Sequence, residues 1–286
     1  MNHVEEFFTF AAERYRIMLR REAGLPFPWT DDPVLRDFYF CNVFREDDRV
    51  TTWFRKNVRE PLRDNPERVT LATIGFRWFN RIETGERILP MLLAQGWDTP
   101  LAKLKLTGVQ PLITGAYMIK SPTGMNKLDG LCWCMDQLGN LRDVRSATTL
   151  EHATEALAKR PFLGPFLAYE VVTDLRHTVV LEHASDIMTW ANAGPGAVRG
   201  LNYIFGTKFV RNRRDDILPM LRFMRELLAA SRTLWPWHER PWEMREVEHT
   251  LCEFSKYKEG QAGEKLKRRY AHDPTKSPVL RTSRAD

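Results

Sequence analysis

The sequence contains no apolar run that approaches the ~18–20 residues needed to cross a bilayer, which argues against a helical membrane span. Its start, MNHVEEFFTFAAERYR, is acidic and then amphipathic, and is therefore unlike a secretory signal. The alternation of polar and apolar residues that indicates strands is almost absent as well. These absences predict a soluble, mainly α protein that has no membrane partner.

Cysteine is scarce, with four residues in 286: Cys41, Cys132, Cys134 and Cys252. Cys132 and Cys134 form a CxC rather than a CxxC pair, and no histidine lies at ligand spacing beside them. This scattered spacing favours buried free thiols over a disulfide framework or a metal centre. We therefore predict no metal-binding residues, with a four-cysteine zinc or iron–sulfur site as the alternative.

The sequence also lacks the motifs of several enzyme classes. A phosphate-binding loop needs GxxxxGK(S/T), and the stretch SPTGMNK at 121–127 resembles it only superficially. GxSxG, HExxH and GxGxxG do not occur either. These 286 residues are therefore not a P-loop kinase by themselves.

Positive charge is in excess, since 43 Lys and Arg against 37 Asp and Glu give a net charge of +6. Much of the excess lies at 256–284, and we predict a basic flexible tail over 271–286. A basic balance suits nucleic acid or another polyanion. Nine tryptophans add surfaces for packing or for stacking.

Apolar residues at helical spacing predict helices over 5–22, 34–43, 50–57, 66–82, 84–93, 100–106, 131–138 and 149–159. Thr30, Asp31 or Asp32 can cap the second of these helices, with Pro33 in its first turn. Thr148 or Thr149 can cap the last. The predicted fold class is therefore mainly α.

The stretch LAKRPFLGPFLAYEVVTDL at 157–175 predicts a helix that ends at Pro161, a tight turn centred on Gly164, and a second helix from Pro165. This pattern resembles the helix–hairpin–helix of DNA glycosylases, in which backbone N–H groups hold a DNA phosphate. Those hairpins usually have a second glycine where this sequence has Phe162. An ordinary turn between two helices is the alternative.

Asp186 follows Gly164 by 22 residues, which is close to the spacing between hairpin and catalytic aspartate in such glycosylases. The alternative is that Asp186 caps a helix that begins near Ile187. The loop GPGAVRG then brings glycines and Arg199 together, so that backbone and guanidinium can approach a phosphate. A plain tight loop is the other interpretation.

Four blocks, PFPWTDDPVL, FCNVFREDDRVT, GPGAVRG and EHTLCEFSKY, together resemble the alpha-glutamyl/putrescinyl-thymine pyrophosphorylase family. That family includes the helical domain found beside phage 5-hydroxymethyluridine DNA kinases. The resemblance extends from about Phe7 to about Tyr270 and agrees with the predicted hairpin, because the family is distantly related to DNA glycosylases.

The resemblance implies a DNA-glycosylase-like helical fold with a helix–hairpin–helix. We expect a single domain over 1–270 with two lobes, of which 149–205 is the hairpin lobe. It also implies a phage-encoded protein that acts in the host cytoplasm on thymine hypermodification. A pathway kinase makes 5-pyrophosphomethyluracil in DNA, and a family member displaces the pyrophosphate with an amino acid or a polyamine. Because no P-loop is present, the transfer step is predicted here, with glycine as the first choice of amine.

Such a transfer needs an aromatic pocket for a flipped base, cations for pyrophosphate and a carboxylate that deprotonates the amine. The predicted catalytic residues are Asp186 and Asp48, and Asp32 and Glu253 are the further candidates for the base. The predicted pyrophosphate- or substrate-binding residues are Arg45, Arg49, Asn42, Lys120, Arg199, Glu253 and Lys256. The predicted DNA-binding residues are Gly164, Arg211, Arg213 and Arg214, and the predicted stacking residues are Trp29 and Trp190.

Further aromatic candidates are Phe27, Phe40, Phe44 and Trp53, for which a core position is the usual alternative. The charged run Arg45–Arg49 is either an exposed turn whose charges pair with one another or an arginine–aspartate network that faces a cleft. No cofactor is required for the transfer, although a divalent metal could assist the departure of pyrophosphate. The expected partners are double-stranded DNA with modified thymine, the amine substrate and the pathway kinase.

Two other functions share these requirements. A DNA glycosylase that acts on a modified pyrimidine would also need a flipped base, a hairpin and an aspartate. A non-catalytic DNA-binding partner of a hydroxymethyluracil DNA kinase would need only the DNA contacts.

Overall fold

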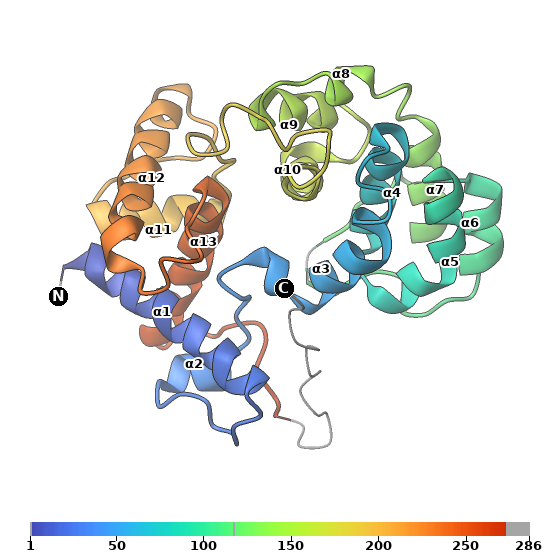
Figure 1. Cartoon of the computed structure of the whole chain (residues 1–286). Coiled ribbons are helices and arrows are strands. Elements are labelled where there is room, and N and C mark those ends of the chain that lie inside the picture. Colours follow the sequence, from blue (N-terminus) through green and yellow to red (C-terminus); the bar gives the residue numbers. More distant parts are fainter. Residues whose placement is uncertain (1, 117, 273–286) are drawn as a thin grey trace. The chain divides into compact units, whose positions relative to one another are not determined.

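The computed structural model describes residues 2–116 and 118–272, which form two compact units (Figure 1). Unit 1 combines the two ends of the chain, up to Asp47 and from Ala193 onward, and unit 2 is Asp48–Asn192. The range 149–205, expected to form one lobe, is divided between the two units at Ala193. Of the predicted tail, residues 273–286 lie outside the described residues.

The mainly α fold class is confirmed. Within the ranges that the structure describes, extended pairing is limited to one isolated antiparallel bridge between Phe38 and Arg269. The relation to DNA glycosylases stays a prediction.

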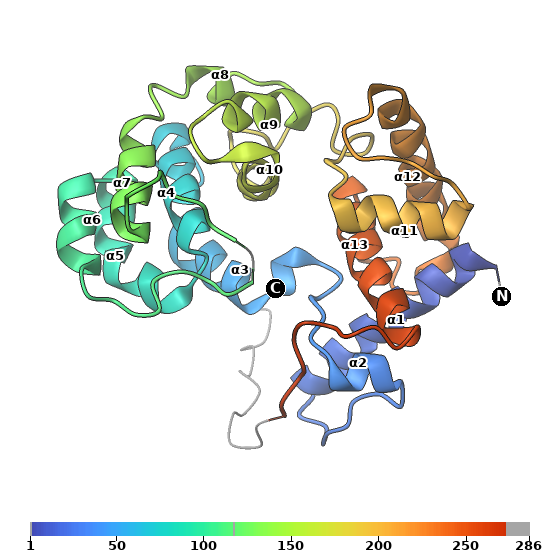
Figure 2. The same ribbon diagram turned by 180° about the vertical axis from the view of Figure 1, so that it is seen from behind.

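Unit 1 is built from helices of the first and last parts of the chain, which pack against one another (Figure 2). These elements are α1 (His3–Glu22), α2 (Pro33–Asp37), the single 3-10 turn η1 (Arg45–Asp47), α11 (Pro195–Phe205), α12 (Arg214–Leu234) and α13 (Met244–Gln261). Their common core is aromatic, with Phe7 of α1 edge-on to Phe254 of α13 at a centroid distance of 5.5 Å and to Trp242 at 6.0 Å.

The helix predicted over 34–43 is wrong beyond Asp37. Its start is as predicted, because Asp32 accepts hydrogen bonds from the backbone N–H groups of Val34 and Leu35 at 2.9 Å, and Pro33 occupies the first turn. Phe38 then adopts an extended backbone conformation, and the chain continues to Asn42 without a helix.

Two glycines of the stretch GPGAVRG lie inside α11, so the prediction that this stretch forms a loop is wrong. The binding of a phosphate by Arg199 stays a prediction. A Cβ atom on Gly196 would lie 2.5 Å from Sγ of Cys252, and one on Gly200 would lie 2.5 Å from the carbonyl oxygen of Leu251. These glycines therefore permit the close approach of α11 to α13.

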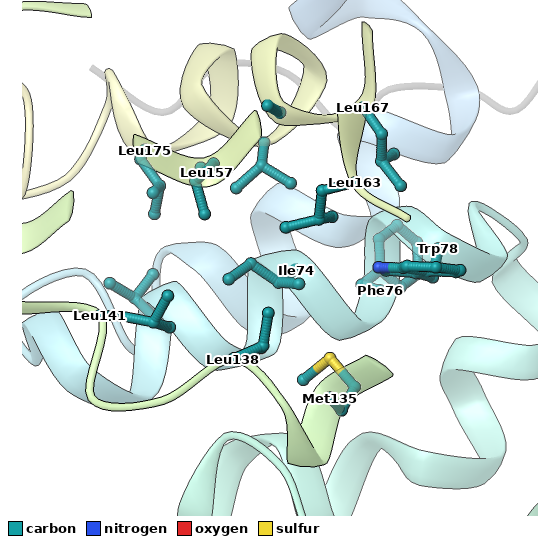
Figure 3. Packing of buried hydrophobic residues seen from close by; sticks show 14 of the residues in the cluster. Ile74, Phe76, Trp78, Met135, Leu138, Leu141, Leu157, Leu163, Leu167 and Leu175 are labelled. Carbon is teal, nitrogen blue, oxygen red and sulfur yellow. The ribbon is translucent and has the colours of Figure 1, made fainter. Parts of the chain in front are cut away.

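Unit 2 contains α3 (Arg49–Phe54), the π-helical turn η2 (Arg55–Arg59), α4 (Pro66–Phe79), α5 (Ile82–Gln95), α6 (Thr99–Leu106), α7 (Lys127–Asp136), α8 (Arg142–Arg145), α9 (Leu150–Ala158) and α10 (Gly164–Leu175). The helices predicted over 50–57, 66–82, 84–93, 100–106, 131–138 and 149–159 are thus present, with ends that differ by a few residues. In the core, Leu157 of α9 and Leu175 of α10 point toward Ile74 of α4 (Figure 3).

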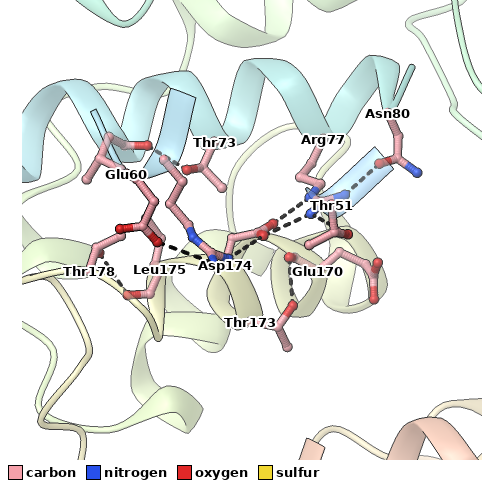
Figure 4. A network of polar contacts seen from close by, with 12 residues as sticks. Thr51, Glu60, Thr73, Arg77, Asn80, Glu170, Thr173, Asp174, Leu175 and Thr178 are labelled. Carbon is pink, nitrogen blue, oxygen red and sulfur yellow. Dashed lines mark hydrogen bonds and ion pairs between the residues drawn. The ribbon is translucent and has the colours of Figure 1, made fainter. Parts of the chain in front are cut away.

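A buried ion network joins four elements of unit 2, namely α3, η2, α4 and α10 (Figure 4). Arg77 of α4 donates to both carboxylate oxygens of Asp174, at 2.5 Å from Nε and 2.8 Å from Nη2. Arg77 also donates to Thr51 Oγ1 at 3.1 Å and to Asn80 Oδ1 at 2.7 Å. Arg59 of η2 adds a third contact to Asp174 at 3.3 Å, and both arginines and the aspartate are only 1% exposed. The network fixes α3, η2, α4 and α10 together.

The helix pair predicted around Gly164 is present. Thr149 caps α9 through a bond from the His152 N–H at 3.1 Å, as predicted for this position. The turn to α10 contains two left-handed residues, Phe162 with φ of 59° and Gly164 with φ of 58°. Phe162 thus adopts, at a higher steric cost, the conformation that a glycine would adopt easily.

Candidate functional site

An extended segment at 39–42 is held from one side by a buried arginine of α1. Arg14 is 3% exposed, and its guanidinium donates to the carbonyl oxygens of Cys41 and Asn42, at 3.1 Å from Nε and 3.0 Å from Nη2 respectively. An arginine can satisfy several carbonyl groups at once because its donors form a planar fork. The segment therefore gains from Arg14 the hydrogen bonds that a helix would otherwise supply.

α13 holds the same segment from the other side through residues at helical spacing. Glu253 accepts the backbone N–H of Cys41 at 3.1 Å, and Lys256 donates to the carbonyl oxygen of Tyr39. His249, one turn earlier, hydrogen-bonds the backbone of Asn42. These three side chains form one stripe of α13. Glu253 and Lys256, predicted to bind substrate, thus have a structural function in positioning this segment.

The clamped segment forms one wall of a pocket in unit 1. The residues that line this pocket come from α1, from the segment 27–42 and from the region after α13, which contributes Tyr270. They are Arg14, Ile17, Arg21, Phe27, Trp29, Thr30, Leu35, Arg36, Phe38, Tyr39, Phe40, Cys41, Asn42 and Tyr270. Six of them carry aromatic rings, which suits a planar ligand.

The aromatic rings of the pocket contact one another. Trp29 lies edge-on to Phe27 with centroids 5.3 Å apart, and Tyr270 lies 6.0 Å from Trp29. The guanidinium of Arg21 lies over the Trp29 ring at 5.3 Å. Trp29 is also oriented by its indole N–H, which donates to the Leu25 carbonyl at 2.7 Å.

The lining of the pocket carries positive charge. Three arginines line it, and none of its described lining residues carries a carboxylate. Arg36 pairs with Asp37 just outside, at 2.7 Å, and this hydrogen bond raises the pKa of the Arg36 guanidinium. Aromatic walls with arginines at the edge are suited to a planar group that carries negative charge, such as a nucleobase with its phosphate.

His249 lies behind this wall among positive charges. Burial lowers the pKa of its imidazole well below the ordinary value, and the nearby Arg245, Arg14 and Arg45 lower it further. Because Nε2 has no hydrogen-bond partner among the residues that the structure describes, the bond to Asn42 is made by Nδ1. His249 is therefore neutral near pH 7, with a lone pair on Nε2.

The structure brings only some of the predicted site residues together. Trp29 and Asn42 both line the pocket, together with Phe27 and Phe40 from the wider aromatic set. Asp32, a reserve catalytic candidate, instead caps α2 and accepts the hydroxyl of Tyr257 at 2.6 Å.

The boundary between the two units falls inside the charged run Arg45–Arg49, after Asp47. Arg45 begins η1 and is half-buried in unit 1, whereas Asp48 and the exposed Arg49 belong to unit 2. Asp47, which was not predicted, is the buried acid of this run and pairs with Arg240 at 2.7 Å. Phe44 anchors the segment, because the Arg240 guanidinium lies over its ring at 3.9 Å.

Asp186 receives backbone hydrogen bonds in unit 2. Its two carboxylate oxygens accept the N–H groups of Leu150 at 2.7 Å and Glu151 at 3.0 Å, at the start of α9. The alternative that it caps a helix near Ile187 is wrong, because residues 186–189 form a turn. Asp186 thus stabilises the first helix of the predicted hairpin, and its catalytic role stays a prediction.

The other predicted residues are not among those that line the pocket. Trp190 packs edge-on against Tyr169 in unit 2 at 5.6 Å, and Lys120 is exposed on a loop of that unit. Arg199 is exposed on α11 and pairs with Glu259 at 3.0 Å. Three basic residues precede or begin α12 and are exposed or half-buried, namely Arg211, Arg213 and Arg214.

Sequence reasoning missed two residues that shape the pocket. Arg14 lies in an amphipathic helix where arginine is usually solvated, and no local pattern distinguishes it from Arg16. Tyr270 reaches the pocket because the chain after α13 pairs with segment 37–39, through Tyr270 N–H to the Asp37 carbonyl at 2.8 Å. Both placements depend on contacts between distant parts of the chain.

Among the residues described by the structure, every helix is too short or too polar to cross a bilayer. The fold and the pocket thus define a mainly helical protein of two units with an aromatic, arginine-edged binding pocket. The chain belongs to the family described as "5-hmdU DNA kinase, helical domain", whose model matches residues 1–266.

A relative of this chain is the 5-hmdU DNA kinase of Bacillus phage SP10, with 28% identity over 282 residues. The match covers 88% of this chain and 44% of the kinase, so the chain spans less than half the length of that relative. No solved structure matches the chain.

Proposed function

We propose that this protein acts in phage thymine hypermodification, as a transferase that displaces pyrophosphate from 5-pyrophosphomethyluracil in DNA. The incoming nucleophile is the amine of an amino acid, glycine first, or of a polyamine. Membership of the 5-hmdU DNA kinase helical-domain family supports the pathway. The absence of a phosphate-binding loop from these 286 residues favours the transfer step over phosphorylation.

The observation that carries this proposal is the pocket in unit 1. A base that reacts at its 5-methylene group must leave the DNA stack, and extruded bases are held between aromatic rings. Trp29, Phe27 and Tyr270 supply such rings, and Arg21 lies beside them. We assign the modified uracil to this pocket and propose that Asn42, which lines it, contacts the polar edge of the base.

The leaving pyrophosphate requires positive charge where its own negative charge develops. In our proposal Arg45 and Arg49 supply it, with Lys120 and Arg199 as further candidates. The amine must lose a proton before or during attack, and Asp48 is the proposed base. DNA phosphates are proposed to contact the N–H groups of the turn at Gly164 and the basic residues Arg211, Arg213 and Arg214.

Incubation with DNA that contains 5-pyrophosphomethyluracil and a mixture of amino acids and polyamines tests the activity. Nucleoside mass spectrometry is expected to reveal a thymidine derivative that carries the amine, in intact strands. Abasic sites would instead identify a glycosylase. No new nucleoside with any donor would refute the transferase.

Trp29→Ala tests the assignment of the pocket. We expect transfer to fall by about 10- to 100-fold, because one stacking ring contributes about 1–3 kcal/mol to holding a base. Trp29→Phe should retain most activity. Trp237→Ala is the matched control, since Trp237 is a half-buried tryptophan of the same unit that contacts Tyr15 at 4.5 Å and does not line the pocket.

A second candidate is a non-catalytic domain that presents DNA to a kinase. Two observations favour it: the family is described as the helical domain of a kinase, and both oxygens of Asp186 are engaged by α9. Asp48→Asn and Arg49→Ala discriminate between the two. Loss of transfer with DNA affinity retained supports the transferase, whereas weaker DNA binding without any effect on modification supports the presenting domain.

A further inference from the structure

An exposed cysteine residue lies in the wall of the pocket, and its backbone is fixed. Cys41 lines the pocket between Phe40 and Asn42 and is exposed. The backbone of Cys41 is held on both sides of its Cα atom, because its N–H donates to Glu253 and its carbonyl oxygen accepts from Arg14. This clamp leaves the thiol of Cys41 little freedom other than rotation of its side chain.

A neutral histidine lies beside this thiol. A ring nitrogen of His249 lies within 4.8 Å of Cys41 Sγ. Nδ1 of the imidazole is oriented by the Asn42 backbone, which leaves Nε2 with its lone pair. A nucleophile next to a base that is itself oriented by a third group is the usual arrangement for covalent catalysis, and such distances are often longer before substrate binds.

Positive charge surrounds the histidine of this pair. Arg14, Arg45 and Arg245 act on His249 from α1, η1 and α13. Two carboxylates of α13 accept hydrogen bonds nearby: Glu248 accepts Arg245 at 2.6 Å and the Gly194 N–H at 3.3 Å, and Glu253 accepts the Cys41 N–H. Nearby arginines can stabilise a developing thiolate.

We propose that Cys41 is a nucleophile that attacks C6 of the pyrimidine bound in the pocket, with His249 as its base; this inference rests on the proposed function. The C6 position of a 5-substituted uracil is electrophilic because the C5–C6 double bond is conjugated with the C4 carbonyl. An enolate that forms after attack can expel a leaving group from the 5-methylene carbon.

The steps balance as follows. As Sγ bonds to C6, the thiol proton moves to Nε2 of His249, and the C5–C6 π electrons form an enolate at O4. The enolate expels pyrophosphate and leaves an exocyclic methylene at C5. The amine adds to this methylene, which regenerates the enolate, and loses a proton to Asp48, the proposed base, which releases it to solvent. The enolate then expels the Cys41 thiolate, and the C5–C6 double bond is restored. The thiolate recovers its proton from Nε2 of His249.

The first test seeks the covalent intermediate. Reaction with 5-pyrophosphomethyluracil DNA, quenched in denaturant during the first turnover without amine, is expected to give a protein–DNA adduct on a denaturing gel. Peptide mass spectrometry should locate it on Cys41. Cys41→Ala should abolish the adduct and reduce amine transfer by about 100-fold or more. Transfer by Cys41→Ala at the wild-type rate would overturn the covalent route while leaving the proposed function intact.

The second test does not need the transfer reaction. We expect iodoacetamide at neutral pH to alkylate Cys41 about tenfold faster in the wild type than in His249→Asn, whose amide can keep the bond to Asn42 but lacks Nε2. Cys252 is the internal control, because burial raises the pKa of its thiol to about 12. Equal rates in the two proteins would overturn the pairing. If wild type transfers no amine, the proposed function fails, and this measurement still decides whether Cys41 is activated.

Discussion

Arg77 and Asp174 are 97 positions apart, yet Nε and Nη2 of the arginine contact both oxygens of the aspartate inside unit 2, at 2.5 and 2.8 Å. Removal of one partner would leave the other charge buried. We expect Arg77→Met to lower the free energy of unfolding by about 3–5 kcal/mol, measured by urea denaturation.

The exposed pair Arg63–Glu182 is the control for this change. Its two side chains are 46% and 23% exposed, with the ions 2.6 Å apart. Arg63→Met should change the free energy of unfolding by less than about 1 kcal/mol. Similar effects of the two substitutions would contradict a special role for the buried network.

Gly200→Ala should loosen the contact between α11 and α13. A Cβ atom at this position would lie 2.5 Å from the backbone oxygen of Leu251, which cannot move away as a flexible side chain can. We expect a loss of about 1–3 kcal/mol, seen as a lower Tm. Gly115→Ala is the control, since nothing lies within 4 Å of its added carbon. An unchanged Tm for Gly200→Ala would mean that α11 and α13 can move apart without a loss of stability.

Asp186→Ala separates a structural from a catalytic role for this residue. Loss of its bonds to the Leu150 and Glu151 N–H groups should lower stability by about 0.5–2 kcal/mol. Thr149→Ala removes another cap of the same helix and should have a similar effect on Tm. If Asp186→Ala alone abolishes transfer at a temperature where both variants are folded, Asp186 is also catalytic.

Glu246 is expected to make stability fall as pH rises. Burial raises the pKa of its carboxyl to about 7, against an ordinary 4.5, so the folded protein keeps a proton that the unfolded chain releases. Between about pH 4.5 and 7 the folded state binds more protons, and the free energy of unfolding therefore decreases with pH.

Glu246→Gln keeps an oxygen for the Glu243 N–H, which the wild-type residue accepts at 2.9 Å, but cannot ionise. The difference between wild type and variant, measured by urea denaturation at several pH values, should change by up to about 1.4 kcal/mol per pH unit. Parallel pH profiles for the two proteins would show that Glu246 does not titrate in this range.

Helices that are specified by nearby residues could be predicted from the sequence. α6 and α9 have apolar spacing and a capping residue within a few positions, and both appear close to where they were expected. The segment after Asp37 could not be predicted, because its extended course depends on Arg14 and on Glu253, which is 212 positions from Cys41.

In the candidate site, too, some residues could be predicted from the sequence and others could not. Trp29 and Asn42 could be proposed from residue type and resemblance, and both line the pocket. Cys41 was predicted only as one of four buried free thiols, which is wrong because this residue is exposed. Its proximity to His249 could not be predicted, because the two residues are far apart in sequence. Chemistry that depends on two distant residues becomes visible only once the fold has brought them together.

The division of unit 1 between the two ends of the chain has a consequence for biosynthesis. α1 leaves the ribosome before unit 2, but α11 and α13, which cover its apolar face, are made only after all of unit 2. Unit 2 can therefore complete its core while Phe7 and its neighbours in α1 are still exposed to solvent. The pocket, whose wall needs Glu253 and Tyr270, can thus form only after the whole of unit 2 has been made.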